Sequence, residues 1–236
     1  MRTLIVHAHH EPTSFNAAMT NAAVAALEGA GHEVLVSDLY AMKWDPVSDR
    51  RNFRRTADAT RLDQQVEERL ASSDGRGFAP ELEEQIARLE WADHIVFQFP
   101  IWWLGMPAIL KGWIDRVFAV GVAYGGGRWF DRGRLAGKRA QLSLTTGGGA
   151  APYSADGVYG PIEPILFPIT HGILGFVGFD VLEPHVVYGP QRMTDAERAA
   201  ALDEWRARVL TLDTAPVLPK LRSDDYENFV RKAVAA

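Results

Sequence analysis

2-RTLIVHA-8 is a short apolar run rich in residues that favour β-strands. A stretch with helical composition and a glycine stop follows it, 16-NAAMTNAAVAALEGAG-31. A second strand-like run, 33-EVLVSDL-39, then completes a strand–helix–strand unit. Since such a unit lays its two strands parallel in one sheet with the helix on a face, the N-terminus predicts an α/β protein.

The same alternation continues toward the C-terminus. We expect strands at 94–100, 138–146 and 179–188, and helices at 80–93, 105–118, about 161–176 and 194–212. Thr194 is the predicted N-cap of the last helix, and a proline lies in the first turn of the helix at 105–118. The polar, arginine-rich stretch at about 40–80 interrupts the pattern, and we interpret it as an excursion from the domain.

Five strands with intervening helices predict an α/β fold of the flavodoxin-like kind. In this fold a doubly wound five-stranded parallel sheet carries helices on both faces. The predicted domain covers residues 1–215, and residues 216–236 are predicted to form a short, loosely attached C-terminal arm. Ligands of such sheets bind outside the carboxyl ends of the strands, where the strand order reverses.

Composition excludes several functional classes. The chain has 236 residues, a formal net charge of -5 and no basic stripe with interleaved aromatics, so nucleic acid is not expected as a partner. No stretch gives 18 charge-free apolar residues, so membrane insertion is not expected and the cytoplasm is the default location. The absence of cysteine excludes disulfides, thiolate nucleophiles and iron–sulfur clusters.

Three loops that follow predicted strands hold the unusual residues: 9-HHEPTSFN-16, 100-PIWWLGMP-107 and 145-TTGGGAAPYS-154. Loops at the carboxyl ends of different strands converge on one edge of a parallel sheet, as a ligand pocket requires. Neither a G-x-G-x-x-G nor a P-loop motif follows the first strand. The sequence therefore predicts a ligand site of another kind.

Each of these loops also has a purely structural interpretation. Thr13 and Ser14 suit either helix capping or phosphate binding at a helix N-terminus. The glycines after Thr146 suit either a tight turn or the close approach of a ligand, and the Trp102–Trp103 pair suits a core, a dimer surface or a stacking wall. A metal site at His9 and His10 is disfavoured because adjacent residues of an extended loop point apart.

The motifs together resemble a known family. The string 98-QFPIWWLGMPAILKGWIDRVF-118, with 8-AHHEPTSFN-16, 37-SDLYAM-42, 145-TTGGGAAPYS-154 and 179-FDVLEP-184, resembles the NAD(P)H:quinone oxidoreductases, which are DT-diaphorase-like flavoproteins. The resemblance runs from about residue 2 to about residue 215. It implies a homodimeric NAD(P)H dehydrogenase (quinone) with FAD at the dimer interface. Such an enzyme takes a hydride from NAD(P)H and passes two electrons to a quinone by a ping-pong scheme.

The resemblance also implies roles for individual residues. The cofactor would be held by His9, Thr13, Phe15, Asn16, Ala18, Pro100, Ile101, Trp102, Trp103, Leu104, Thr145, Thr146, Gly147, Gly148 and Arg198. The substrate would meet Tyr124, Trp103, Leu104 and Phe176. Tyr153 and Tyr159 would be the catalytic pair, donating hydrogen bonds to the flavin edge where negative charge accumulates.

Four features depart from the family pattern. Tyr159 stands where these quinone reductases often have a histidine, and Gly126 stands where an aromatic would be expected. The C-terminal arm is shorter than in the animal enzymes. His171 matches a histidine near a structural metal of a relative, but no cysteine partner is present, so we expect it to be a helix or interface residue and expect no metal.

Two other functions remain open at this point. One is an FMN-dependent reductase of azo, nitro or quinone compounds, although Arg198 and the long C-terminal helix favour FAD. The other is a flavin-binding regulatory subunit of a potassium-efflux transporter. A homodimer is expected because Trp103, Phe118, Tyr124 and Phe176 supply more aromatic surface near the strand ends than a soluble monomer usually exposes.

Overall fold

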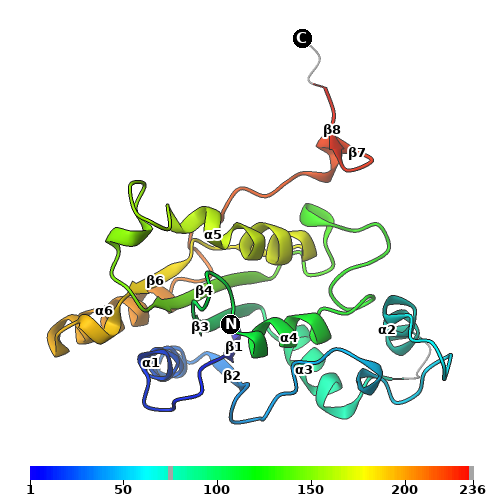
Figure 1. The fold of residues 1–236 in the computed structure, drawn as a ribbon, viewed down its shortest axis with the longest axis horizontal. Coiled ribbons are helices and arrows are strands. Elements are labelled where there is room, and N and C mark those ends of the chain that lie inside the picture. The colour runs from blue at the N-terminus through cyan, green and yellow to red at the C-terminus, as the bar shows by residue number, and fades with distance from the viewer. Residues whose placement is uncertain (74–76, 234–236) are drawn as a thin grey trace.

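The computed structural model describes residues 1–73 and 77–233, and its centre is one parallel sheet (Figure 1). The strand order is β2-β1-β3-β4-β5, with β6 also paired to β4. The strands are β1 (Arg2–His7), β2 (Glu33–Asp38), β3 (His94–Pro100), β4 (Arg139–Thr146), β5 (Asp180–Val181) and β6 (His185–Tyr188). This confirms the predicted flavodoxin-like, doubly wound arrangement, with the order reversing between β1 and β3.

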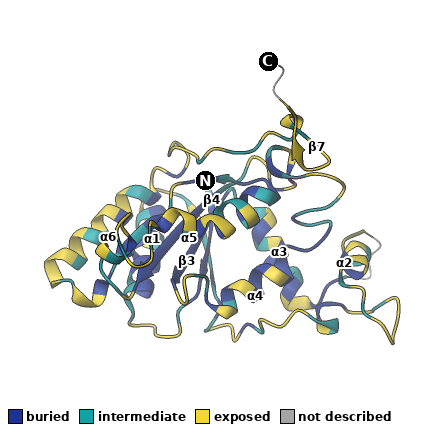
Figure 2. Ribbon diagram, turned by 45° about the horizontal axis from the view of Figure 1, so that its top comes forward, coloured by how far each residue is buried: buried dark blue, intermediate teal, exposed yellow. Residues whose placement is uncertain are grey.

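Helices cover both faces of the sheet, and the central strands β1, β3 and β4 are buried between them (Figure 2). Ile5 and Val96 point to a core shared with α1 and α6, whereas Leu4 and Phe97 point to the opposite core. That second core is covered by α3, α4 and α5. The helices are α1 (Phe15–Gly29), α3 (Pro80–Trp91), α4 (Ala108–Val117), α5 (Ile162–Ile169) and α6 (Asp195–Val209).

Side-chain caps explain where α1 and α6 begin. The Ser14 hydroxyl accepts a hydrogen bond from the Ala17 N–H at the start of α1. Thr194 caps α6 as predicted, in a reciprocal capping box with Glu197. The predicted start of α4 at residue 105 is wrong because residues 102–105 form a tight turn, and Pro107 is the N-cap rather than a first-turn residue.

The strand predicted at 179–188 is also interrupted, at residues 182–184. The side chains of Gln141 and Arg208 donate to the Glu183 carbonyl, and Pro184 has no N–H with which to continue the ladder. The fifth position of the sheet is therefore filled by two short strands, β5 and β6.

A helix that the sequence analysis missed lies in the 40–80 excursion. It is α2 (Gln64–Ser73), and the residues that it buries are the carboxylates Glu67 and Glu68. Because it has no apolar stripe, hydrophobic periodicity could not reveal it. Arg116, itself only 3% exposed, ties the excursion to α4 by donating to the Asn52 side chain and the Asp45 carbonyl.

The C-terminal arm is more firmly attached than expected. The Leu218 N–H donates to the Val181 carbonyl, and Arg132 pairs with Asp224 at 2.6 Å. Farther along, β7 (Tyr226–Glu227) and β8 (Val230–Arg231) form a hairpin whose tip packs on Trp129. The last three residues of the predicted arm lie outside the described residues. In the described part of the chain, no helix has the length and apolar character needed to cross a membrane.

Candidate active site at the carboxyl edge of the sheet

The loop after β1 leads into the N-terminus of α1. Ser14 caps the helix, while the Thr13 hydroxyl donates to the Glu11 carboxylate at 2.7 Å. The N–H groups of Phe15 and Asn16 find no acceptor within the described ranges. Free N–H groups and the positive end of the helix dipole together suit an anion such as a phosphate. Ala18 lies one turn farther along, half-buried.

Behind this loop, Asn16 joins three neighbouring elements through its buried side chain. Its amide donates to the Thr145 hydroxyl at 2.8 Å, and its carbonyl oxygen accepts from the Gln98 amide at 2.9 Å. The predicted residues Asn16 and Thr145 are thus brought together, but the side chain of Asn16 is bonded to protein groups. This network fixes α1 against the ends of β3 and β4.

The loop after β3 holds two residues in the left-handed backbone region. The φ angles are +50° at Trp103 and +57° at Leu104. Trp102 and Gly105 exchange two backbone hydrogen bonds of 3.0 Å across them, so the four residues form a closed turn. Such a conformation costs about 1–3 kcal/mol per non-glycine residue and clusters at functional sites. The turn leaves Trp103 101% exposed, so packing within one chain does not account for its side chain.

The remaining predicted residues of this loop differ in burial. Pro100 ends β3, and Ile101 is 8% exposed, with its N–H donating to the Thr145 carbonyl at 2.8 Å. Trp102 lies near the rings of His9 and His10, with centroids 6.4 and 6.0 Å away. Burial lowers the pKa of His9, and the neighbouring His10 lowers it further. Both effects favour the neutral imidazole of His9.

The glycines after β4 have no internal reason to be glycine. A Cβ added at Gly147, Gly148 or Gly149 meets nothing within 4 Å, and none of the three has a positive φ angle. Neither packing nor backbone geometry therefore requires them. The preceding Thr146 hydroxyl donates to the Gly148 carbonyl at 2.6 Å and shapes the loop. Open space over a glycine backbone is what a flat ligand needs to approach closely.

Tyr153 and Tyr159 lie together at this edge. Their ring centroids are 5.1 Å apart, and Tyr153 also contacts Tyr188 at 5.7 Å. Tyr153 is buried whereas Tyr159 is half-exposed. Burial raises the pKa of the Tyr153 phenol, and the neighbouring Tyr159 raises it further, so the hydroxyl stays protonated near neutrality. The sequence analysis missed Tyr188, although its place as the last residue of β6 marks it for this edge.

Tyr124 and Phe176, two predicted substrate residues, lie in another part of the chain. Their rings contact each other, with centroids 6.4 Å apart. Tyr124 follows the C-terminus of α4, and Phe176 comes four residues before β5, so both belong to the amino side of the sheet. Figure 1 shows the loop after α4 and the loop after β4 at opposite ends of the molecule. Seven steps along β4 separate these ends by roughly 20 Å.

The aromatic surface is smaller than the sequence predicted. Phe118 is buried rather than exposed, because it packs between Trp113 and Phe179 in the core. Arg198 lies in the first turn of α6, where its guanidinium donates to the carbonyls of Pro190 and Met193 and pairs with Asp195. These bonds hold Arg198 beside the β6 loop.

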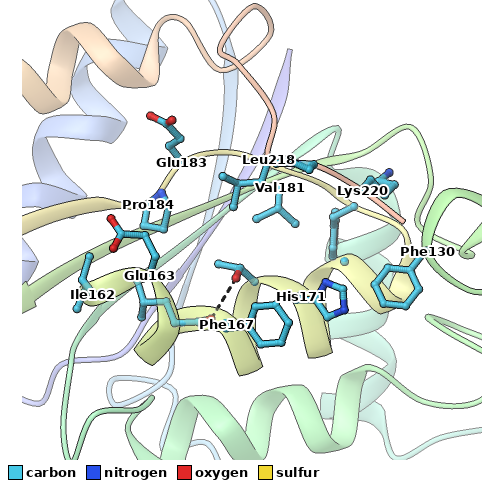
Figure 3. A pocket seen from close by; sticks show the side chains of 15 residues that line it. Phe130, Ile162, Glu163, Phe167, His171, Val181, Glu183, Pro184, Leu218 and Lys220 are labelled. Atoms are coloured by element: carbon cyan, nitrogen blue, oxygen red, sulfur yellow. Dashed lines mark hydrogen bonds between the residues drawn. The ribbon is translucent and has the colours of Figure 1, made fainter. Parts of the chain in front are cut away.

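A separate cavity of about 500 Å³ lies between α5, β5 and residues 218–220 (Figure 3). It also borders the short π-helix Thr170–Gly175, which continues α5. His171 packs between Phe167 and Phe130, with ring centroids 4.5 and 4.8 Å away. The residues expected to hold a flavin are not among those that line this cavity. Among residues 1–73 and 77–233, no group of three or more His, Asp or Glu side chains could hold a metal ion.

Comparison with known proteins agrees with this geometry. A family model described as a flavodoxin-like fold matches residues 1–209. The chain is 44% identical over 235 residues to a ribosyldihydronicotinamide dehydrogenase-like protein of Penicillium crustosum, covering 96% of this chain and 86% of that protein. It is also 44% identical over 212 residues to NAD(P)H dehydrogenase (quinone) 1 of Rattus norvegicus, covering 89% and 77%. A solved structure from Klebsiella pneumoniae, assigned as a quinone reductase, matches with a TM-score of 0.91 at 40% identity, covering 96% of this chain and 91% of that one.

Proposed function

The chain belongs to the flavodoxin-like family of NAD(P)H:quinone oxidoreductases, and we propose that it reduces quinones with NAD(P)H through bound FAD. The observation that carries the proposal is the open space over Gly147, Gly148 and Gly149. Glycines that the fold itself does not need are explained if a planar group lies against their backbone. The nearby Trp102–Gly105 turn, with its exposed indole, gives a second wall for such a group.

The residues at the edge fit the two ends of FAD. The free N–H groups of Phe15 and Asn16 at the start of α1 would bind the pyrophosphate, with Arg198 toward the adenine. Residues 102–104 and 145–148 would hold the ring system. When bound, the flavin supplies the redox chemistry, accepting a hydride from NAD(P)H and passing two electrons to the quinone.

Tyr153 and Tyr159 would stabilise the negative charge that develops at the pyrimidine edge of the ring. Tyr153 is the stronger candidate because its ring is buried among Tyr159 and Tyr188, and a buried donor acts in a low dielectric. Both phenols can donate a hydrogen bond, but neither can become a cation. The histidine that the family often has at the position of Tyr159 can become one.

The distribution of substrate residues supports a homodimer with the active site at the interface. One chain carries Trp103 and Leu104 at the carboxyl edge but holds Tyr124 and Phe176 at the other end of the sheet. A second copy related by a two-fold axis would bring its Tyr124 and Phe176 over the first copy's flavin site. It would also cover the exposed Trp103 indole.

The test combines cofactor analysis with kinetics. The purified protein is expected to release FAD, identified by mass, and to oxidise NAD(P)H rapidly with a soluble quinone. Double-reciprocal plots should be parallel because both substrates would use one pocket in turn. If the protein releases FMN alone, the cofactor is FMN and the FAD part of the proposal is wrong. Absence of quinone-dependent turnover in the flavin-loaded protein would refute it, and a flavin-loaded monomer in light scattering would refute the shared site.

A further inference from the structure

Helix α2 presents one face to the loop at 118–125, which carries Tyr124. Gln65, Glu68 and Ser72 lie three and four residues apart, so their side chains share that face. Each of the three contacts the loop: Glu68 and Ser72 at Val120, and Gln65 at Tyr124. Figure 1 shows α2 beside the loop that follows α4.

Side chains of α2 contact both backbone polar groups of Val120, the N–H and the carbonyl. The Glu68 carboxylate accepts a hydrogen bond from the Val120 N–H at 2.7 Å, in a buried position. The Ser72 hydroxyl lies 3.3 Å from the Val120 carbonyl and 3.0 Å from the Arg69 carbonyl of its own helix, so its single proton is shared between these two acceptors. Gln64 in turn donates to the second oxygen of Glu68 at 2.9 Å, so both carboxylate oxygens are occupied.

The backbone after Val120 connects these contacts to Tyr124. The Gly121 N–H donates to the Tyr124 carbonyl at 2.8 Å, closing a turn over residues 121–124. Gly121 has a φ angle of +89°, and a Cβ at this position would lie 2.1 Å from the Ser72 hydroxyl. Only glycine therefore lets the turn approach α2 this closely. At the end of the turn, Gln65 makes a long hydrogen bond of 3.4 Å to the Tyr124 hydroxyl.

The neighbouring Glu67 provides a contrast. It is 3% exposed, against 4% for Glu68, but it accepts from the Ala57 N–H within the excursion. Burying a carboxylate is costly unless its hydrogen bonds are satisfied, and burial raises the pKa of Glu68. Two adjacent buried carboxylates thus face different segments, and Glu68 is the one directed at the loop of Tyr124.

We propose that Glu68 is a positioning residue that fixes the 118–125 loop and thereby sets where Tyr124 meets the substrate. This inference rests on the proposed function, in which Tyr124 lines the quinone pocket. Glu68 itself touches neither substrate nor cofactor in this scheme. Its loss should weaken substrate binding in enzyme that is folded and fully loaded with flavin.

The kinetic test compares Glu68→Leu with Glu67→Leu, two substitutions of equally buried carboxylates on one helix. Glu68→Leu is expected to raise the KM for quinone about tenfold with kcat changed less than about twofold, the pattern of lost uniform binding. Glu67→Leu should not share that rise, because its carboxylate bonds to Ala57 and not to the loop: its KM should stay within about twofold of wild type. Glu68→Gln should restore the wild-type KM, since its amide oxygen still accepts from Val120.

A second readout does not depend on activity. In hydrogen exchange followed by mass spectrometry, the peptide covering 118–125 should exchange faster in Glu68→Leu and at the wild-type rate in Glu67→Leu. If Glu68→Leu does not fold, Ser72→Ala replaces it and should give smaller changes in the same direction. An unchanged exchange rate, or faster exchange with an unchanged KM, would overturn the proposal. A wild-type protein without quinone reduction would refute the proposed function instead, and exchange would still decide whether Glu68 holds the loop.

Discussion

The two edges of the sheet use their side chains in opposite ways. At the amino edge, charged side chains hydrogen-bond to backbone carbonyls of the same chain. Lys138 donates to the carbonyls of Glu90 and Ala92. Arg139 donates to the carbonyls of Leu212 and Ala215. At the carboxyl edge, by contrast, glycines lie under open space and a tryptophan is fully exposed on a strained turn. Stability alone accounts for these charged groups at the first edge, whereas no contact within the chain accounts for the glycines and the exposed indole at the second.

The largest effect that separates the edges is expected from Gly148→Val. A Cβ at this position meets no protein atom within 4 Å, and the valine side chain would extend into the space proposed for the flavin. We expect FAD affinity to fall about a thousandfold, roughly 4 kcal/mol, while the melting temperature of the flavin-free protein moves by less than about 2 °C. Fluorescence titration with FAD and thermal melting measure the two quantities.

The control is Gly29→Ala at the C-terminus of α1, away from the proposed flavin site. A Cβ at Gly29 also meets nothing within 4 Å. This change should leave FAD affinity intact and stabilise the helix by about 0.5–1 kcal/mol. Wild-type affinity in Gly148→Val would show that the open space over the glycine is not the ligand site.

The reverse pattern is expected at the amino edge from Arg139→Met. The guanidinium donates to two carbonyls beyond the end of α6, at 2.6 and 3.0 Å, and methionine keeps most of the apolar stem. Loss of these charged hydrogen bonds should lower the free energy of unfolding by about 2–3 kcal/mol. Urea titration measures this loss. FAD affinity and kcat/KM should not change, and a parallel loss of FAD affinity would mean that the two edges are coupled.

Tyr153→Phe tests the chemistry of the carboxyl edge, because it removes one hydroxyl without removing the bound flavin. The ring stays packed against Tyr159 and Tyr188, so stability and FAD loading should hold. Loss of one hydrogen-bond donor should slow NAD(P)H-dependent bleaching of the flavin band by about 5- to 150-fold, or roughly 1–3 kcal/mol. Stopped-flow absorbance measures the rate.

Tyr159→Phe is the control for this prediction, because the half-exposed phenol should contribute less. The bleaching rate should also be nearly flat from about pH 6.5 to 8, because the pKa of Tyr153 is raised and that of His9 is lowered. An unchanged rate in Tyr153→Phe would remove this residue from the mechanism.

Sequence patterns predicted the sheet because its strands are apolar, and they predicted the start of α6 because Thr194 is a recognisable cap. The same reasoning failed for α2, whose buried face is formed by Glu67 and Glu68. Hydrophobic periodicity cannot detect a helix whose burial is made possible by hydrogen bonds to distant backbone groups. The break at Glu183 was missed for a similar reason, since its carbonyl is bonded by side chains of other elements.

The candidate site divides in the same way. Residues that directly follow strands, such as Trp102 and Gly147, could be placed at the carboxyl edge by the rule for parallel sheets. Tyr124 and Phe176 could not, because neither directly follows a strand: Tyr124 lies in the loop after α4, and Phe176 lies at the end of the helical segment that continues α5. The family resemblance groups them with Trp103 and Leu104 as substrate residues, whereas in the structure their rings contact each other on the amino side of the sheet, away from Trp103 of the same chain.

The smallest effect is expected from the ion pair between Arg2 and Asp93 at the amino edge. The Arg2 guanidinium donates to the Asp93 carboxylate at 2.7 Å and, with the Arg2 backbone N–H, lowers the pKa of Asp93 from 3.8 to about 2. Because the folded state favours the ionised carboxylate, its contribution is present above about pH 4 and is lost as the pH falls toward 2. The two side chains are 44% and 42% exposed, so screening limits this contribution to about 1 kcal/mol or less.

Asp93→Asn should therefore lower the free energy of unfolding by that amount at pH 7, and the difference from wild type should vanish near pH 2. Urea titrations of both proteins between these pH values measure the difference. High salt should reduce it at pH 7, since the pair is exposed. FAD affinity should stay at the wild-type value throughout the pH range in which both proteins are folded. The reason is that this pair lies at the amino edge, whereas the loops proposed to bind flavin follow β1, β3 and β4 at the carboxyl edge. A stability difference that persists unchanged at pH 2 would show that Asp93 acts through neutral hydrogen bonds rather than charge, and the contrast between the edges would then rest on the carbonyl-bound Lys138 and Arg139 alone.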